Sequence, residues 1–314
     1  MVGVAVVPAA PVPLAVIIKP PDMKINYANQ HILVTGGSSG IGLACAKRAA
    51  FLGANVTILG RRVDVLEQAA AEIQAARTAD TFVQVISADV SQEEIVRAAL
   101  CGLIDDRGLP DVVINCAGIT HPGEFTELST EMFHWNMDIN YFGTVYILKT
   151  LVPGMIRRGS GNIINISSGA GLFVYYGYTA YGASKSAVNG LSEGLRMELK
   201  PYGIQVSVVI PGDTNTPQLV YENKFKPEIT RAINQIGGLM QPEQVAAEIF
   251  DQAARGKYLI LPGSDIKFLY KLLRILGRTV FYAYFDSLVS KALKSSPVSK
   301  PGPGCQDQAG PNQV

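Results

Sequence analysis

The chain has 314 residues, long enough for one large or two small domains, and 48% of them are hydrophobic, enough to bury a core without disulfides. Its 27 basic and 26 acidic residues balance to a net charge of +1, which argues against nucleic acid as a partner. The four cysteines and three histidines show no paired or metal-ligand spacing, so we expect no metal site and a reduced, intracellular α/β enzyme.

Residues 1–28 are expected to form a disordered extension. Residues 1–22 are apolar, but early prolines interrupt any membrane-spanning helix, and no basic segment precedes them as in a secretory signal. Two alternatives stay open. The segment is a weak membrane tether, or it is an untranslated upstream stretch, because Met23 stands just before the first expected strand.

Short β-branched runs alternate with alanine- and leucine-rich helical stretches between residues 29 and 263. Nearly continuous apolar strands that alternate with helices are typical of a parallel sheet covered on both faces. We therefore predict one Rossmann-type, doubly wound α/β domain with about seven parallel strands. The expected strands are 31–36, 55–60, 82–88, 111–118, 161–168, 204–210 and 257–263, and the expected helical stretches include 40–52, 63–77, 91–103, 130–157, 180–200 and 242–254.

A glycine-rich turn joins the first expected strand to the helix that follows it. Gly36, Gly40 and Gly42 would let the backbone turn tightly and approach a pyrophosphate at the helix N-terminus. Their G-x-x-x-G-x-G spacing differs from the G-x-G-x-x-G dinucleotide pattern, so a glycine-rich turn without a ligand stays an alternative.

The end of the second expected strand indicates which dinucleotide this turn would bind. An acidic residue there would bind a ribose 2′-hydroxyl, but this chain has Arg61 and Arg62. A guanidinium matches a phosphate, and Ser38 would add a hydrogen bond, so we predict NADP(H) rather than NAD(H). The alternative is that both arginines are merely solvated.

Candidate catalytic residues follow the later strands. Tyr181 and Lys185 are four residues apart and so share one helix face, where the lysine cation is expected to lower the pKa of the phenol. Such a tyrosine suits proton exchange with a carbonyl or alcohol. Ser168 closes the fifth expected strand at the edge where α/β sheets bind ligands, and Asn140 lies inside a helical stretch.

Together these features resemble the short-chain dehydrogenase/reductase family from about residue 31 to 262. The T-G-x-x-x-G-I-G loop, the N-x-A-G turn, Asn140, Ser168 and Y-x-x-x-K occur in order, with Cys116 where asparagine is commonest. The resemblance implies that Tyr181 is the general acid and that Lys185 lowers its pKa and binds the nicotinamide ribose. Ser168 would orient the carbonyl, and Asn140 would anchor a water relay to Lys185.

The same resemblance implies a cofactor site built from the loops that follow the strands. Asp89 and Val90 would contact the adenine, and Asn115 would hold the central strand. The implied NADP(H) site comprises Gly36, Ser38, Ser39, Gly40, Ile41, Gly42, Arg61, Arg62, Asp89, Val90, Asn115, Ala117, Gly118, Tyr181, Lys185, Pro211, Gly212, Thr214 and Thr216.

Residues 212–240 are expected to form the substrate lid. The D-T-x-T-P, E-N-x-x-K-P-E and later P-E-Q-V-A motifs resemble the branch of the family that reduces 3-ketodihydrosphingosine, a long-chain amino ketone, with NADPH to dihydrosphingosine. Asp213, Glu222 and Glu228 are candidates to bind the ammonium group of such a substrate. The alternatives are a generic reductase of 3-oxoacyl, steroid or other hydrophobic ketones, and a membrane-docked NADP(H) sensor without catalysis.

Residues 264–294 are expected to form amphipathic helices beyond the domain. Lys267, Lys271, Arg274 and Arg278 would form one basic stripe opposite large apolar residues, as in helices that lie in a membrane interface. Packing on the domain or on a second subunit is the alternative. We expect a homo-oligomeric, peripheral membrane enzyme, docked through 265–294 on the cytoplasmic face of the endoplasmic reticulum if eukaryotic. Residues 295–314 are expected to be a disordered tail.

Overall fold

The computed structural model describes residues 25–234 and 238–295. The expected N-terminal extension up to residue 24 and the expected tail from residue 296 lie outside the described residues. Residues 235–237 of the expected lid also lie outside them.

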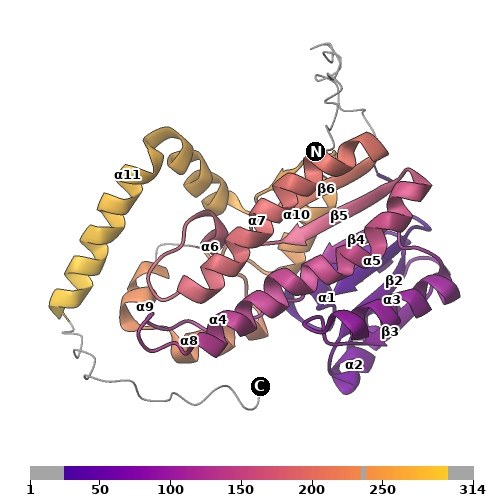
Figure 1. Ribbon diagram of the computed structural model, residues 1–314, viewed down its shortest axis with the longest axis horizontal. Coiled ribbons are helices and arrows are strands. Elements are labelled where there is room, and N and C mark those ends of the chain that lie inside the picture. Colours follow the sequence, from indigo (N-terminus) through magenta and orange to yellow (C-terminus); the bar gives the residue numbers. More distant parts are fainter. Residues whose placement is uncertain (1–24, 235–237, 296–314) are drawn as a thin grey trace, which may run out of the picture.

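Seven parallel strands form one sheet in the order β3-β2-β1-β4-β5-β6-β7, which confirms the predicted doubly wound fold (Figure 1). The chain reverses its direction of winding between β1 and β4, so that the loops after these two strands lie side by side. The strands are β1 (His31–Thr35), β2 (Asn55–Gly60), β3 (Val83–Ser87), β4 (Val112–Asn115), β5 (Gly161–Ile166), β6 (Ile204–Val209) and β7 (Leu259–Ile260).

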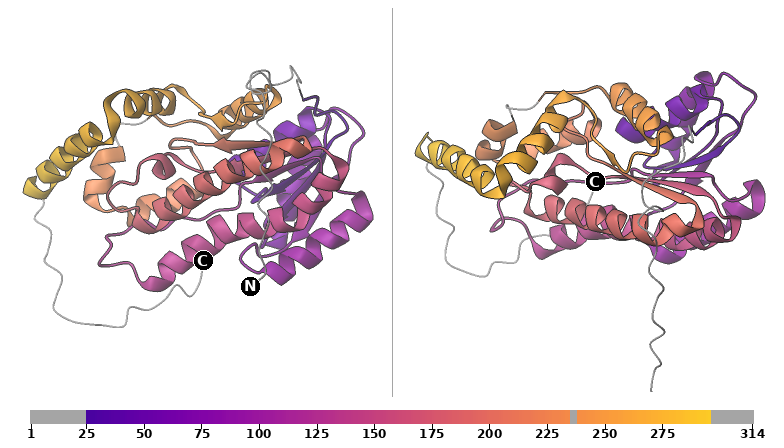
Figure 2. Two further views of the ribbon diagram at one scale, coloured as in Figure 1. Left: turned by 45° about the horizontal axis from the view of Figure 1, so that its top comes forward. Right: turned by 90° about the horizontal axis from the view of Figure 1, so that it is seen from above.

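Helices cover both faces of the sheet (Figure 2). Successive strand residues point to opposite faces, so Ile32 and Val34 enter the core on one side, while Leu33 enters the core on the other. The first core is covered by α1 (Gly40–Phe51), α2 (Val63–Ala75) and α10 (Pro242–Ala254). The second is covered by α3 (Glu93–Arg107), α5 (Gly143–Arg158) and α7 (Thr179–Leu199).

Two expected elements differ from the structure near the ligand edge of the sheet. The expected strand 111–118 ends at Asn115, because the next residues leave the sheet to line a cavity. The expected single helix 130–157 is interrupted: α4 (Thr130–Met137) and α5 are joined by a π-helical turn, Asp138–Phe142.

Short helices cover the carboxyl ends of the strands. They are α6 (Gly169–Leu172), α8 (Pro217–Phe225) and α9 (Glu228–Asn234). Pro217 begins α8, where a missing N–H costs nothing, and the Thr216 hydroxyl caps this helix by accepting a hydrogen bond from the Leu219 N–H. A 3-10 turn, Lys200–Tyr202, ends α7.

The C-terminal α11 (Ser264–Ser295) packs against α9 and projects from the body of the molecule (Figure 1). Gly277 has φ 72° and ψ 166°, which kinks α11 into two segments. The prediction of one continuous basic stripe is therefore wrong, because the kink falls between Arg274 and Arg278. No helix among the described residues is long and apolar enough to cross a membrane.

Candidate active site

A cavity of about 920 Å³ lies at the carboxyl edge of the sheet, between the strand-end loops, α8 and α11. The predicted cofactor residues line it, apart from Asn115. Of the predicted catalytic residues, Ser168, Tyr181 and Lys185 line it, and Asn140 does not. The sheet thus brings nearly all of the predicted site together around one space.

The glycine loop has no room for a side chain at Gly36 or Gly42. Gly36 has φ 65°, and a Cβ on Gly42 would lie 2.1 Å from the Gly36 carbonyl oxygen. Ser39, the residue that precedes α1, makes no side-chain capping hydrogen bond to that helix. Bare backbone before an uncapped helix N-terminus matches the binding of a pyrophosphate.

Basic side chains border the next part of the cavity, after β2. Arg61 and Arg62 are exposed and line it, and the Arg61 guanidinium lies 3.9 Å from the Asp89 carboxylate. A Cβ on Gly60 would lie 3.7 Å from the Ser38 hydroxyl, so the loop serine stands beside the end of β2. These donors fit an adenosine ribose that carries a phosphate.

The reactive groups come from α7 and the end of β5. The buried Lys185 Nζ donates to the Ile166 carbonyl at 3.0 Å and lies 5.8 Å from the centre of the Tyr181 ring. Ser168 follows β5 and caps α6, accepting from the Ala170 N–H at 3.2 Å. Ser168 and Gln218 of α8 line the cavity together with Tyr181, and their polar groups act on its hydroxyl.

Burial sets the ionisation of these groups. It raises the pKa of Tyr181, and the Glu222 carboxylate raises it further, while hydrogen bonds with Ser168 and Gln218 act the other way. This net direction is opposite to the lowering that the Tyr181–Lys185 spacing predicted. Burial also lowers the pKa of Lys185 to about 8, which leaves its ammonium mostly charged at neutral pH.

Two predicted asparagines lie behind the cavity rather than in its wall. The buried Asn140 amide, in the π-helical turn, donates to the Ile119 carbonyl and to the Ser184 hydroxyl and accepts from the Ile119 N–H. The Asn115 amide donates to the Asn165 side chain at 2.8 Å, which ties β4 to β5. Both therefore fix backbone that lines the site.

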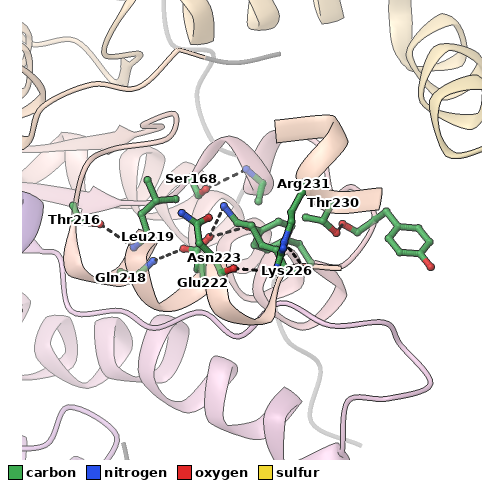
Figure 3. Close-up of polar contacts among 12 residues, drawn as sticks. Ser168, Thr216, Gln218, Leu219, Glu222, Asn223, Lys226, Thr230 and Arg231 are labelled. Atoms are coloured by element: carbon green, nitrogen blue, oxygen red, sulfur yellow. Dashed lines mark hydrogen bonds and ion pairs between the residues drawn. The ribbon is translucent and has the colours of Figure 1, made fainter. Parts of the chain in front are cut away.

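Sequence reasoning missed Tyr178 and Gln218, which line the cavity around Glu222. The Tyr178 hydroxyl donates to Glu222 Oε2 at 2.7 Å, and Gln218 Nε2 donates to Oε1 at 3.3 Å (Figure 3). Gln218 and Glu222 are four residues apart. This spacing would have placed them on one helix face, had 217–225 been recognised as a helix.

The remaining wall of the cavity is apolar and comes from α6 and α11. Phe173 packs its ring against Phe285 with 4.7 Å between centroids and against Tyr282 with 5.7 Å. The apolar and aromatic α11 residues that line this part are Ile266, Phe268, Leu269, Leu272, Leu276, Val280, Tyr284 and Phe285, and the polar Ser264 and Asp265 line it at the start of the helix. The reactive group of a long apolar molecule would lie at Tyr181 while its chain follows α11.

Comparison with known proteins agrees with this geometry. The family model of the short chain dehydrogenases matches residues 30–226. A mouse 3-ketodihydrosphingosine reductase is 41% identical over 241 residues, covering 75% of this chain and 71% of the relative. A zebrafish 3-dehydrosphinganine reductase is 39% identical over 251 residues, covering 79% and 75%.

A solved structure shows the same fold. L-sorbose reductase from Gluconobacter frateurii, complexed with NADPH and L-sorbose, is 26% identical with a TM-score of 0.68. The match covers 78% of this chain and 99% of that one.

Proposed function

The chain belongs to the short-chain dehydrogenase family of oxidoreductases, and we propose that it reduces the ketone of 3-ketodihydrosphingosine to dihydrosphingosine with NADPH, a step of sphingolipid biosynthesis. One observation carries the proposal: the same cavity joins the Ser168, Tyr181 and Lys185 cluster to a long apolar wall from Phe173 to α11. The names of the mouse and zebrafish relatives supply the substrate.

The residues present fit a nicotinamide dinucleotide. The bare Gly36–Gly42 turn would hold its pyrophosphate, and Asp89 and Val90 would border the adenine. Arg61, Arg62 and Ser38 favour the form with a ribose phosphate. When bound, this cofactor supplies the hydride for the ketone carbon.

Residues of the chain itself supply the proton and control its transfer. Tyr181 would donate its hydroxyl proton to the ketone oxygen, which Ser168 would hold by a second hydrogen bond. Burial keeps Tyr181 protonated before the reaction, and the Lys185 ammonium stabilises the phenolate that remains. Asn140 holds the Ile119 backbone beside this cluster through two hydrogen bonds.

We also propose that α11 docks the enzyme on a membrane surface. Phe268 and Ile275 are 66% and 68% exposed, although both are large and apolar, and Lys271 and Arg274 are exposed on the same segment. Such a segment suits an anionic lipid surface. A substrate could then pass from the bilayer along α11 to Tyr181. The proposal includes the cytoplasmic face of the endoplasmic reticulum as the location, and a homo-oligomer.

Replacing the proposed acid tests the catalytic part. We expect Tyr181→Phe to lower kcat for 3-ketodihydrosphingosine by about 10²–10⁴-fold, the usual contribution of a positioned proton donor. The Kd for NADPH, measured by fluorescence titration, should change by less than about twofold, because only one hydroxyl is removed. Turnover retained by this variant would contradict the assignment of Tyr181.

A further inference from the structure

One buried carboxylate in the cavity wall has no place in the proton transfer just described. Glu222 of α8 is 8% exposed and lines the cavity together with Tyr178 and Gln218. The Tyr178 hydroxyl donates to its Oε2, and the Gln218 amide donates to its Oε1. Lys226 Nζ lies 3.6 Å from Oε2, one helical turn further along α8 (Figure 3).

The charge of this carboxylate opposes proton donation by Tyr181. A negative charge near a phenol raises the pKa of the phenol, and Glu222 does so here. That makes Tyr181 a weaker acid, so proton donation to a ketone does not explain why a carboxylate is buried beside it. A buried carboxylate is costly unless cations and donors compensate it. Lys226, Tyr178 and Gln218 do so from the protein side, and a cationic group of the substrate would add to them from the cavity.

The charges around the cavity leave room for such a cation. Asp213 also lines the cavity and raises the pKa of both Glu222 and Tyr181 by its charge. Lys226 is the cation that pairs with Glu222, and its side chain is 3% exposed. Among the described residues Lys226 does not line the cavity, so it supports Glu222 from behind. Glu222 and Asp213 thus give this part of the wall two carboxylates, and the ammonium that pairs with Glu222 lies behind it.

We propose that the Glu222 carboxylate, bordered by Asp213, binds the ammonium group on the carbon next to the ketone. This inference rests on the proposed function. Tyr178 carries the geometric argument, because its hydroxyl donates to Glu222 Oε2 at 2.7 Å and its ring centroid lies 5.9 Å from that of Tyr181. One side chain therefore separates the proton donor from the carboxylate, as neighbouring carbonyl and ammonium groups require.

The contacts also distinguish Glu222 from the other lid acids. Glu228, in α9, is exposed and is not among the described residues that line the cavity. Asp213 lines the cavity but is only partly buried. Glu222 is buried and accepts a hydrogen bond from Tyr178, whose ring packs near that of Tyr181.

The test compares two ketones of equal chain length in NADPH-dependent reduction: 3-ketodihydrosphingosine and its analogue without the amino group. We expect the wild-type kcat/KM to favour the amino ketone by at least about 30-fold. Glu222→Gln should bring this ratio to below about threefold, because the neutral amide keeps an acceptor for Tyr178 but no charge. Glu228→Gln, a matched loss of charge in the lid, should leave the ratio unchanged.

The outcomes separate this inference from the proposed function. A Glu222→Gln variant that binds NADPH normally and keeps the wild-type ratio would overturn the inference and leave the reductase in place. Should Glu222→Gln not fold, the wild-type ratio decides: equal use of both ketones overturns ammonium recognition. If the wild-type enzyme reduces neither ketone, the proposed function fails and the inference fails with it.

Discussion

Arg61 is the residue that we propose determines which dinucleotide the site prefers. Its guanidinium lies in the cavity beside Asp89 and is exposed enough to meet a phosphate. We expect Arg61→Asp to raise the KM for NADPH by about 10- to 100-fold, because a charged hydrogen bond is replaced by repulsion. The KM for NADH should change much less.

Steady-state kinetics with both cofactors measures this change. Arg97→Asp is the control, since Arg97 lies on α3 away from the cavity and is exposed there. An NADPH/NADH preference that Arg61→Asp leaves intact would show that the phosphate is bound elsewhere.

The pKa of Lys185 predicts how the rate of reduction depends on pH. Burial lowers its pKa to about 8, so the ammonium is lost as the pH rises through that value. In the proposed mechanism the ammonium stabilises the Tyr181 phenolate, so we expect kcat for ketone reduction to be constant from about pH 6 to 7.5 and to fall above about 8. A pH profile of kcat at saturating NADPH measures this dependence. A rate that increases from pH 7 to 9 would contradict the role of Lys185.

At the scale of residues, the sequence predicted groups by spacing and missed effects that depend on burial. Tyr181 and Lys185 share one helix face, as four-residue spacing requires. The pKa of Tyr181 is raised, opposite to the prediction. The residues that bury it and the Glu222 carboxylate come from distant parts of the chain. The position of Asn115 behind the cavity could not be predicted either, since its partner Asn165 lies 50 residues away on β5.

At the scale of elements, α11 determines access to the cavity and the proposed contact with lipid. Its first segment carries the exposed Phe268 and Ile275 beside Lys271 and Arg274. We expect the Phe268→Glu, Ile275→Glu double variant to reduce co-sedimentation with anionic vesicles at least about tenfold, because two exposed apolar side chains that would enter the lipid are lost and two negative charges gained.

Ile95→Glu is the matched control for this variant. Ile95 is 41% exposed on α3, at the other end of the molecule from α11 (Figure 1). Its replacement should leave vesicle binding at the wild-type level. If the double variant binds vesicles as the wild type does, α11 is not the docking segment.

The helices and strands show which features the apolar pattern of the sequence predicts and which it does not. Apolar runs predicted all seven strands, because buried parallel strands have a distinctive pattern. The π-helical turn at Asn140 and the kink at Gly277 were not predicted. A π-turn changes the backbone without changing the apolar pattern, and the kink was hidden in an otherwise helical stretch, where a single glycine is tolerated.

At the scale of the whole molecule, one fold places two functions at one edge of the sheet. The loops after β1 and β2 form the wall suited to a dinucleotide, and α6 and α11 form the wall suited to an apolar chain. Ser168 and Tyr181 lie between them. This division explains why the fold could be predicted from the alternation of strands and helices, whereas the substrate depends on the lid and on α11.

Relative turnover of three ketones tests the central claim most directly. NADPH oxidation is followed with detergent-dispersed 3-ketodihydrosphingosine, a 3-oxoacyl thioester and a steroid ketone at equal concentrations. We predict that kcat/KM for the sphingoid ketone exceeds the other two by at least about 30-fold, because its chain and polar end match the two walls of the cavity. Rapid reduction of the thioester or steroid with the sphingoid ketone inert would contradict the account and leave only the family.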